Sequence, residues 1–380
     1  MNKYSISDDD LIYCQKKLLK TFTFQKCAKL KNNSNDEKLS IFDISYNANI
    51  NIKYSYELLN IIDLYGSYNQ CILTYIPIFI TITLDGCYRR MLKGDYKEFN
   101  ETRLNNEIPK YLRYKYDLKK PLNIKDCYNI LNYQHKKMRD RYLNKYKNIC
   151  HDFIKVPEPH KNGVPHLHCL WFVPNDENLI KYLRKIFKEC CPAPQNHTQK
   201  GLSKEQILKG DTQGFQTNIN DTCAYITKYI FKTFRNIHNK DYKINKLHAW
   251  YINYKIRRFT RSHLKTCNNY RFPIIVYRKI RHHLINLGYK DLSDCFFAFF
   301  SNEKCFINYN LNRKKGDIYI NISLLGKTIS YTKQQTIINH YGDNNKIYKQ
   351  DIIKNNTYVL DYDKNLNKDV YDIYYHSFVS

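Results

Sequence analysis

Two histidines and one glutamate in the middle of the chain have the residue types and spacing of a metal site. His166 and His168 lie two apart in a run of strand-forming residues, and side chains two apart in a strand leave the same face. The preceding Asn162-Gly163 pair favours a tight hairpin turn, which would fold Glu158 back towards both imidazoles. This mixed nitrogen and oxygen set suits Mg²⁺ or Mn²⁺. The alternative is a histidine pair at a strand edge that binds nothing.

A pair of tyrosines further along the chain supplies candidate nucleophiles. Residues 221–235 have the periodicity of a helix, and at roughly 100° per residue one side of it carries two phenols and two ammonium groups, from Tyr225, Lys228, Tyr229 and Lys232. A phenolate can attack phosphorus and form a covalent phosphotyrosine when a cation polarises the phosphate and lysines offset its charge. The alternative is a solvated helix face, since 36 residues of this chain are Tyr.

A stretch between residues 228 and 283 interleaves basic with aromatic side chains. That composition suits stacking on unpaired bases together with contacts to the phosphate backbone. The candidate DNA-binding residues are Lys232, Trp250, Arg257, Arg258 and Arg278. The alternative is a basic helical face above aromatic core residues.

Composition narrows the class of protein. The chain of 380 residues has 62 Lys and Arg against 35 Asp and Glu, and its formal charge of +27 indicates a polyanionic partner. Hydrophobic residues make up 43%, too many for a disordered tail. The 13 cysteines include no C-x-x-C pair, which favours reduced thiols. The most apolar stretch, residues 71–84, contains Pro77 and is too short to cross a membrane. The polar, acidic N-terminus is unlike a secretory signal, so we expect a cytoplasmic protein.

The pattern of elements predicts an α+β fold. Residues 72–84 and the pair within 149–174 are expected to form strands of an antiparallel sheet, with the strand at Phe79 beside the strand at His166. Helices are expected at 176–190 and 221–235, the latter packed over one face of the sheet. We divide the chain into an N-terminal region of unknown role (1–70), a domain with the motifs and the basic segment (71–285), and a β-rich C-terminal region (286–380).

Together these segments resemble the HUH endonucleases, specifically the phage replication gene A protein group of rolling-circle replication initiators. The resemblance covers about residues 72 to 285: a strand motif at 79–84, the metal motif at 158–168, the tyrosine motif at 225–232 and a third block from 249 to 278. The order of strand, histidine pair and tyrosines is that of replication initiators, whereas conjugative relaxases typically carry the tyrosine first. The resemblance implies a central antiparallel sheet with helices packed on it.

The resemblance also implies an activity, the nicking and rejoining of single-stranded DNA at a replication origin. Tyr225 and Tyr229 would be the nucleophiles that become linked to the 5′ phosphate, Lys228 would stabilise that phosphate, and Glu158 with the histidine pair would hold the divalent metal. No Walker-type motif occurs, so a host helicase and polymerase are expected partners in a bacterial cytoplasm, without a membrane. Two alternatives remain: an HUH transposase or plasmid mobilisation relaxase, and, from a different class, a non-catalytic nucleic-acid-binding regulator.

Overall fold

The structure is a computed structural model of the whole chain, and it divides into two compact units. One unit comprises residues 1–15 and 52–272, and the other comprises 16–51 and 273–380. Each is described here by itself, and the division of the sequence into three regions stays a prediction. The residues that the structure describes are 4, 6–32, 38–44, 58, 62, 65–66, 69–70, 73–149, 151–217, 228, 244–262, 305–312, 317–324, 327–333, 335–341, 347–354 and 358–361.

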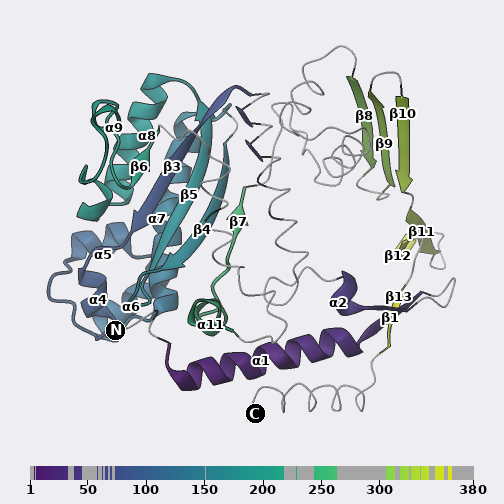
Figure 1. The fold of residues 1–380 in the computed structure, drawn as a ribbon, viewed down its shortest axis with the longest axis horizontal. Coiled ribbons are helices and arrows are strands. Elements are labelled where there is room, and N and C mark those ends of the chain that lie inside the picture. The colour runs from purple at the N-terminus through teal and green to yellow at the C-terminus, as the bar shows by residue number, and fades with distance from the viewer. Residues whose placement is uncertain are drawn as a thin grey trace. The chain divides into compact units, whose positions relative to one another are not determined.

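The first unit is built on a mixed succession of helices and strands (Figure 1). Helix α1 (Asp8–Cys27) begins in this unit and continues into the other. The remaining elements, in chain order, are β3 (Tyr75–Thr83), α4 (Cys87–Met91), α5 (Glu101–Glu107), η2 (Lys110–Leu112), α6 (Arg113–Asp117), α7 (Ile124–Lys145), β4 (Asp152–Pro159), β5 (Pro165–Pro174), α8 (Glu177–Cys190), η3 (Pro194–Asn196), α9 (Lys204–Leu208), β6 (Phe215–Gln216), α11 (Lys246–Asn253) and β7 (Thr260–Arg261).

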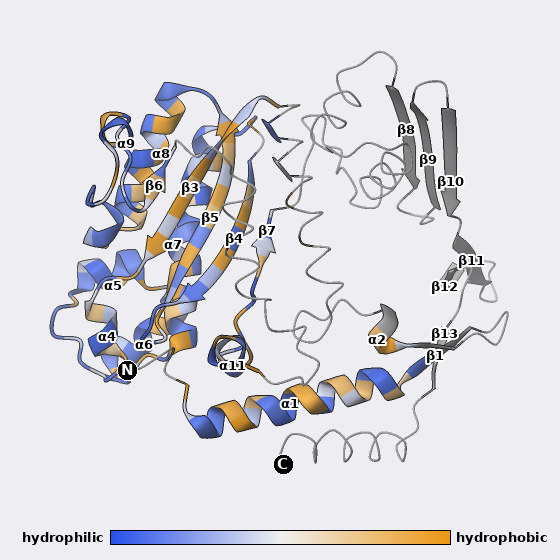
Figure 2. Cartoon of the chain, viewed as in Figure 1, coloured by the Kyte–Doolittle hydropathy of each residue, from blue (hydrophilic) through white to orange (hydrophobic). Residues whose placement is uncertain are grey.

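One antiparallel five-stranded sheet, in the order β6-β3-β5-β4-β7, forms the core of this unit. The predicted α+β class and the predicted pairing of the Phe79 strand with the His166 strand are therefore confirmed. Apolar and β-branched residues make β3 and β5 good central strands (Figure 2). On β3, Ile78, Ile80 and Ile82 are fully buried.

Prolines in β3 and β4 are tolerated because an amide N–H at their positions would have no partner strand to donate to. The amide of Thr81 donates to the Gly214 carbonyl on the β6 side, and the amide of Phe153 donates to the Ser262 hydroxyl on the β7 side. Since amide directions alternate along a strand, Pro77 and the two prolines at 157 and 159 also face these outer sides. The short partners β6 and β7 do not reach them, so no ladder bond to β5 is lost.

Helices α7 and α8 cover the sheet face opposite the histidine pair. The indole Nε1 of Trp171 donates to Nε2 of His135 on α7 at 3.1 Å, and Trp171 lies an odd number of residues from His168. Helix α7 begins with a capping box formed by Asn123 and Asp126. Helix α7 therefore lies behind the sheet in the view of Figure 1, on the face opposite the one that carries His168.

The second unit contains short strands from both ends of the chain. Strands β1 (Lys29–Asn32) and β2 (Lys38–Ser40) form an antiparallel sheet with β13 (Tyr358–Asp361), and α2 (Ile41–Ile44) follows directly. The other strands are β8 (Cys305–Asn312), β9 (Asp317–Leu324), β10 (Lys327–Lys333), β11 (Gln335–Tyr341) and β12 (Ile347–Lys354). They pair as β10-β9-β8 and as β11-β12, all antiparallel.

Candidate metal site

A tight hairpin between β4 and β5 places the glutamate opposite the histidines. The turn is closed by the amide of Gly163, which donates to the His160 carbonyl at 2.8 Å. Gly163 has a φ of 86°, a conformation that glycine adopts without strain. The Asn162 side chain accepts from the Val164 amide, and the resulting register pairs Glu158 directly with His166. The predicted hairpin and its consequence are confirmed.

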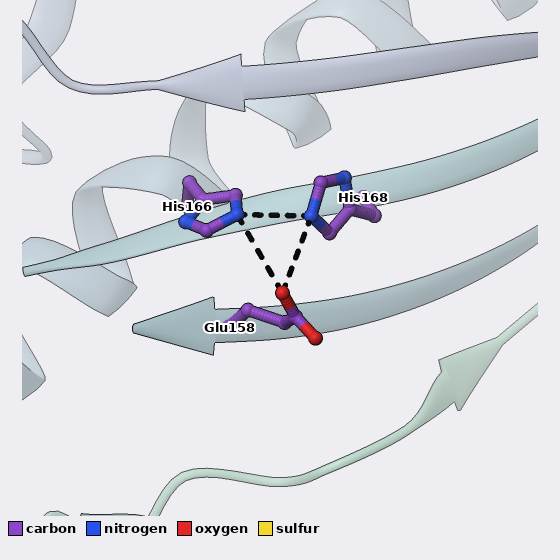
Figure 3. Close-up of side chains that lie close together, drawn as sticks. All are labelled: Glu158, His166 and His168. Carbon is purple, nitrogen blue, oxygen red and sulfur yellow. Dashed lines mark hydrogen bonds and ion pairs between the residues drawn. The ribbon is translucent and has the colours of Figure 1, made fainter. Parts of the chain in front are cut away.

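Three potential ligand atoms converge on one point at this end of the sheet (Figure 3). Nε2 of His166 and Nε2 of His168 are 2.9 Å apart. Oε2 of Glu158 lies 3.9 Å from the first nitrogen and 3.7 Å from the second. The three side chains are 13%, 7% and 4% exposed, respectively for His166, His168 and Glu158. They form a buried cluster in which His166 is the most exposed member.

The geometry fits a small divalent cation. An ion with ligands at about 2.1 Å and angles between 90° and 109° separates neighbouring ligand atoms by about 3.0–3.4 Å. The three observed separations lie within about half an ångström of that range. Glu158 is 4% exposed, and buried carboxylates in proteins are paired or coordinate metals. The donor set is compatible with a divalent metal without selecting one ion.

A threonine on the neighbouring strand orients one of the two imidazoles. Thr81 pairs with His168 across β3 and β5, and its hydroxyl lies 3.2 Å from Nδ1 of that ring. A proton on Nδ1 that is donated to Oγ1 of Thr81 leaves Nε2 deprotonated and able to bind a metal. The Phe79 ring stacks on the same imidazole with centroids 5.6 Å apart. The ring orientation of His168 is therefore held, and the Thr81 hydroxyl is placed to accept from Nδ1 in the tautomer that leaves Nε2 free for a metal.

A third histidine adjoins the cluster. His160, at the start of the hairpin turn, stacks on His166 with ring centroids 4.3 Å apart. Burial lowers the pKa of His160, and the charge of Arg89 on α4 lowers it further. Arg89 is exposed, so a cationic side chain lies beside the buried site at the end of the sheet.

Helix α11 holds the outer edge of the hairpin, and this corrects two of the sequence assignments. The indole of Trp250 is fully buried and donates to the Gly163 carbonyl at 2.9 Å. The guanidinium of Arg258 is 4% exposed and lies 4.3 Å from the ring centroid of Tyr251. Tyr251 in turn donates to the Pro157 carbonyl at 2.6 Å. Trp250 and Arg258 thus support the hairpin from within the core, where a base or phosphate cannot reach them.

Some of the other predicted site residues are exposed, and the rest lie outside the residues that the structure describes. Arg257 is exposed and lies close enough to Lys125 to lower the pKa of that amine, after the larger effect of burial. Lys228 is helical and exposed. The tyrosine pair and two of the basic residues lie outside the described residues: Tyr225, Tyr229, Lys232 and Arg278.

Two side chains of the site were not assigned from the sequence. Thr81 lies in the strand motif, but its role depends on the register that sets it opposite His168. The alternation of the strand could have pointed to Thr81 or Thr83 as a partner of the histidine pair. His160 carried no signal beyond its place in the turn, since the stacking on His166 is a tertiary contact.

Comparison of the chain with protein-family models, with curated proteins and with solved structures returned no match. The fold and the site therefore define the class directly: an α+β protein with a candidate metal site at one end of an antiparallel sheet. Among the described residues, no helix has the length and apolar character needed to cross a lipid bilayer.

Proposed function

We propose that this protein is a metal-dependent tyrosine endonuclease of the HUH type, a rolling-circle replication initiator that nicks and rejoins single-stranded DNA at an origin. The convergence of Glu158, His166 and His168 is the observation that carries the proposal. Its supporting context is the antiparallel sheet around the site and the order of the strand, histidine and tyrosine motifs along the chain.

The site would bind Mg²⁺ or Mn²⁺ through the two Nε2 atoms and the Glu158 carboxylate. A bound cation would polarise the scissile phosphate and offset the charge that develops on its oxygens. The protein's own contribution is preorganisation: Thr81 fixes the His168 ring, and the hairpin fixes Glu158 opposite His166. The ligand atoms are thus held in place before the substrate arrives.

A tyrosine at position 225 or 229 would be the nucleophile. Its phenolic oxygen attacks the phosphorus, the new bond to phosphorus forms, and the bond from phosphorus to the 3′ oxygen breaks. The phenolic proton is transferred overall to the departing 3′ oxygen, which becomes a free hydroxyl. The phosphotyrosine diester retains the energy of the broken bond, so a 3′ hydroxyl can later reverse the step and rejoin the strand. With two tyrosines, a second strand can be cut while the first stays attached.

The wider role follows from this chemistry. Single-stranded DNA at an origin is the substrate, and a helicase and a polymerase of the bacterial host would open and extend it. Of the motif residues that the structure describes, Lys228 and Arg257 are exposed and would be candidates to contact the DNA backbone. The β-rich C-terminal region would form a separate part with its own role.

The test is covalent capture of DNA. The full chain is incubated with labelled, single-stranded hairpin DNA carrying origin-like sequences, in Mn²⁺ or in EDTA, and separated on a denaturing gel. We expect a protein-linked band that requires Mn²⁺ and is lost in Tyr225→Phe/Tyr229→Phe. The matched control is Tyr13→Phe, which removes an exposed hydroxyl on α1 and should keep the band.

Two outcomes would refute the proposal. Cleavage that persists in the double variant at positions 225 and 229 would exclude these tyrosines as nucleophiles. Binding without a covalent band, across several origin-like substrates and both metals, would identify the protein as a regulator that binds nucleic acid without cutting it.

A further inference from the structure

An exposed aromatic stripe lies on η2 and α6, where a folded chain would ordinarily present polar residues. Tyr111, Tyr114 and Leu118 are 62%, 49% and 60% exposed. Tyr111 and Tyr114 lie on η2 and α6, and Leu118 is the C-cap of α6, so their spacing of three and four residues favours one side of this helical segment. The opposite side holds the segment to the fold through Leu112, which is 5% exposed. The stripe is therefore a fixed surface feature with its apolar side outward.

Positive charge surrounds the stripe. Residues 110–120 contain five basic side chains against one acidic one, Asp117. Lys115 is engaged with Asp126 at 2.6 Å, but Lys110, Lys119 and Lys120 are exposed. A surface of exposed aromatic rings among cations complements a polyanion whose bases are unpaired, because the rings stack on bases and the cations meet phosphates.

The surface lies at the same end of the sheet as the candidate metal site. Strand β3 ends at Thr83, which pairs with His166, and α4 begins four residues later at Cys87 (Figure 1). The segment that begins with α4 then packs on the segment that follows α6.

Specific contacts make that packing rigid. The Leu122 amide donates to the Met91 carbonyl at 2.9 Å, the Tyr96 hydroxyl donates to the Lys120 carbonyl at 2.6 Å, and Nζ of Lys119 lies 5.8 Å from the Tyr96 ring centroid. Arg89, on the same short helix, is exposed beside the site. A single strand of nucleic acid held at the metal site can thus continue along α4 towards the exposed aromatic stripe.

We propose that Tyr111, Tyr114, Lys119 and Lys120 form a binding surface for single-stranded DNA that flanks the scissile phosphate. The choice of substrate rests on the proposed function. Duplex DNA fits less well because its bases are stacked on each other and do not offer their faces to Tyr111 and Tyr114. This surface takes the place of Trp250 and Arg258, which are buried.

The first test measures binding without cleavage. Fluorescein-labelled oligo-dT of about 20 nucleotides, which does not pair with itself, is titrated with the full chain in EDTA and followed by anisotropy. We expect Tyr111→Ser/Tyr114→Ser to bind at least about tenfold more weakly, the scale of lost base stacking. The matched control is Ile12→Ser/Tyr13→Ser, two equally exposed residues on α1, which should stay within about twofold of the wild type.

The second test measures how the salt dependence of DNA binding changes when the two lysines are replaced. The logarithm of the association constant falls linearly with the logarithm of the salt concentration, and each lost phosphate contact makes this slope less negative by about 0.7 for a single strand. Lys119→Gln/Lys120→Gln should therefore make the slope less negative by about 1.4. The control pair Lys181→Gln/Lys185→Gln removes the same charge from exposed positions on α8 and should leave the slope unchanged.

The proposal is overturned if the tyrosine and lysine variants bind oligo-dT like the wild type, or if the controls lose binding equally. It is also overturned if the tyrosine variant keeps DNA binding but loses binding to vesicles containing phosphatidylserine, or loses self-association in sedimentation. These outcomes are separate from the proposed function. Weakened oligo-dT binding with no covalent band in the wild type would support the surface and refute the nuclease, and the reverse result would refute only the surface.

Discussion

The hydrogen bond between Thr81 and His168 allows a quantitative test of the metal site. Thr81→Val keeps the shape and the strand preference of the side chain but removes the oxygen that lies 3.2 Å from Nδ1 of His168. The ring then loses the hydroxyl partner of its Nδ1. Losing such a partner typically weakens metal binding 10- to 100-fold, about 1.4–2.8 kcal/mol. Thr83→Val is the matched control, because Thr83 faces the same side of β3 and holds Asn196 through its backbone.

The assay is Mn²⁺ binding by calorimetry, with thermal unfolding as a second readout. At an Mn²⁺ concentration about 100 times the wild-type dissociation constant, bound metal adds about 2.7 kcal/mol to wild-type stability. For Thr81→Val the same concentration is only about 1 to 10 times its dissociation constant, so the gain falls to about 0.4–1.4 kcal/mol. Equal Mn²⁺ affinity in Thr81→Val and the wild type, or an equal loss in Thr83→Val, would refute the orienting role of Thr81.

Three further predictions concern stability and reactivity. A Cβ at Gly214 would lie 2.6 Å from the Asn196 carbonyl oxygen, so Gly214→Ala should cost about 1–3 kcal/mol in urea denaturation; an unchanged midpoint would show that this contact gives way freely. Burial lowers the pKa of His151 to about 3, below its ordinary value, so the unfolded chain takes up the proton first and the folded state loses stability as pH falls from about 6.5 to 3. His151→Phe should reduce the fall in melting temperature between pH 7 and pH 4, and a fall equal to that of the wild type would contradict it. Burial raises the pKa of the Cys127 and Cys169 thiols to about 12, so neither should react with a thiol reagent at pH 8 until denaturant is added. If both thiols of the folded protein were labelled as fast as free cysteine, that burial would be excluded.

The candidate metal ligands were predictable because their signal is local. Alternation along one strand puts His166 and His168 on the same face, and a turn with Gly163 dictates which residue of the preceding strand comes opposite them. A hairpin brings together residues that are only a few positions apart in sequence, so the pattern determines the geometry. The apolar, β-branched run that contains Phe79 likewise indicated a central strand.

The position of Thr81 beside His168 depends on contacts that no local sequence pattern encodes. Thr81 reaches His168 only because β3 pairs with β5 in one particular register, and a shift by one residue would turn its side chain to the other face. That register is set by packing between segments that are far apart in sequence, including the bonds of Asn196 to the end of β3.

The sequence by itself determined the strand with the histidine pair, the hairpin, the α+β class and the basic character of the chain. The tertiary structure decided which aromatic and basic residues are buried and which are exposed. Trp250 and Tyr111 both lie in short helical segments rich in aromatic and basic residues, yet the first is fully buried and the second is 62% exposed. Helical periodicity says which residues share a face, but only the packing of distant segments determines which face is covered.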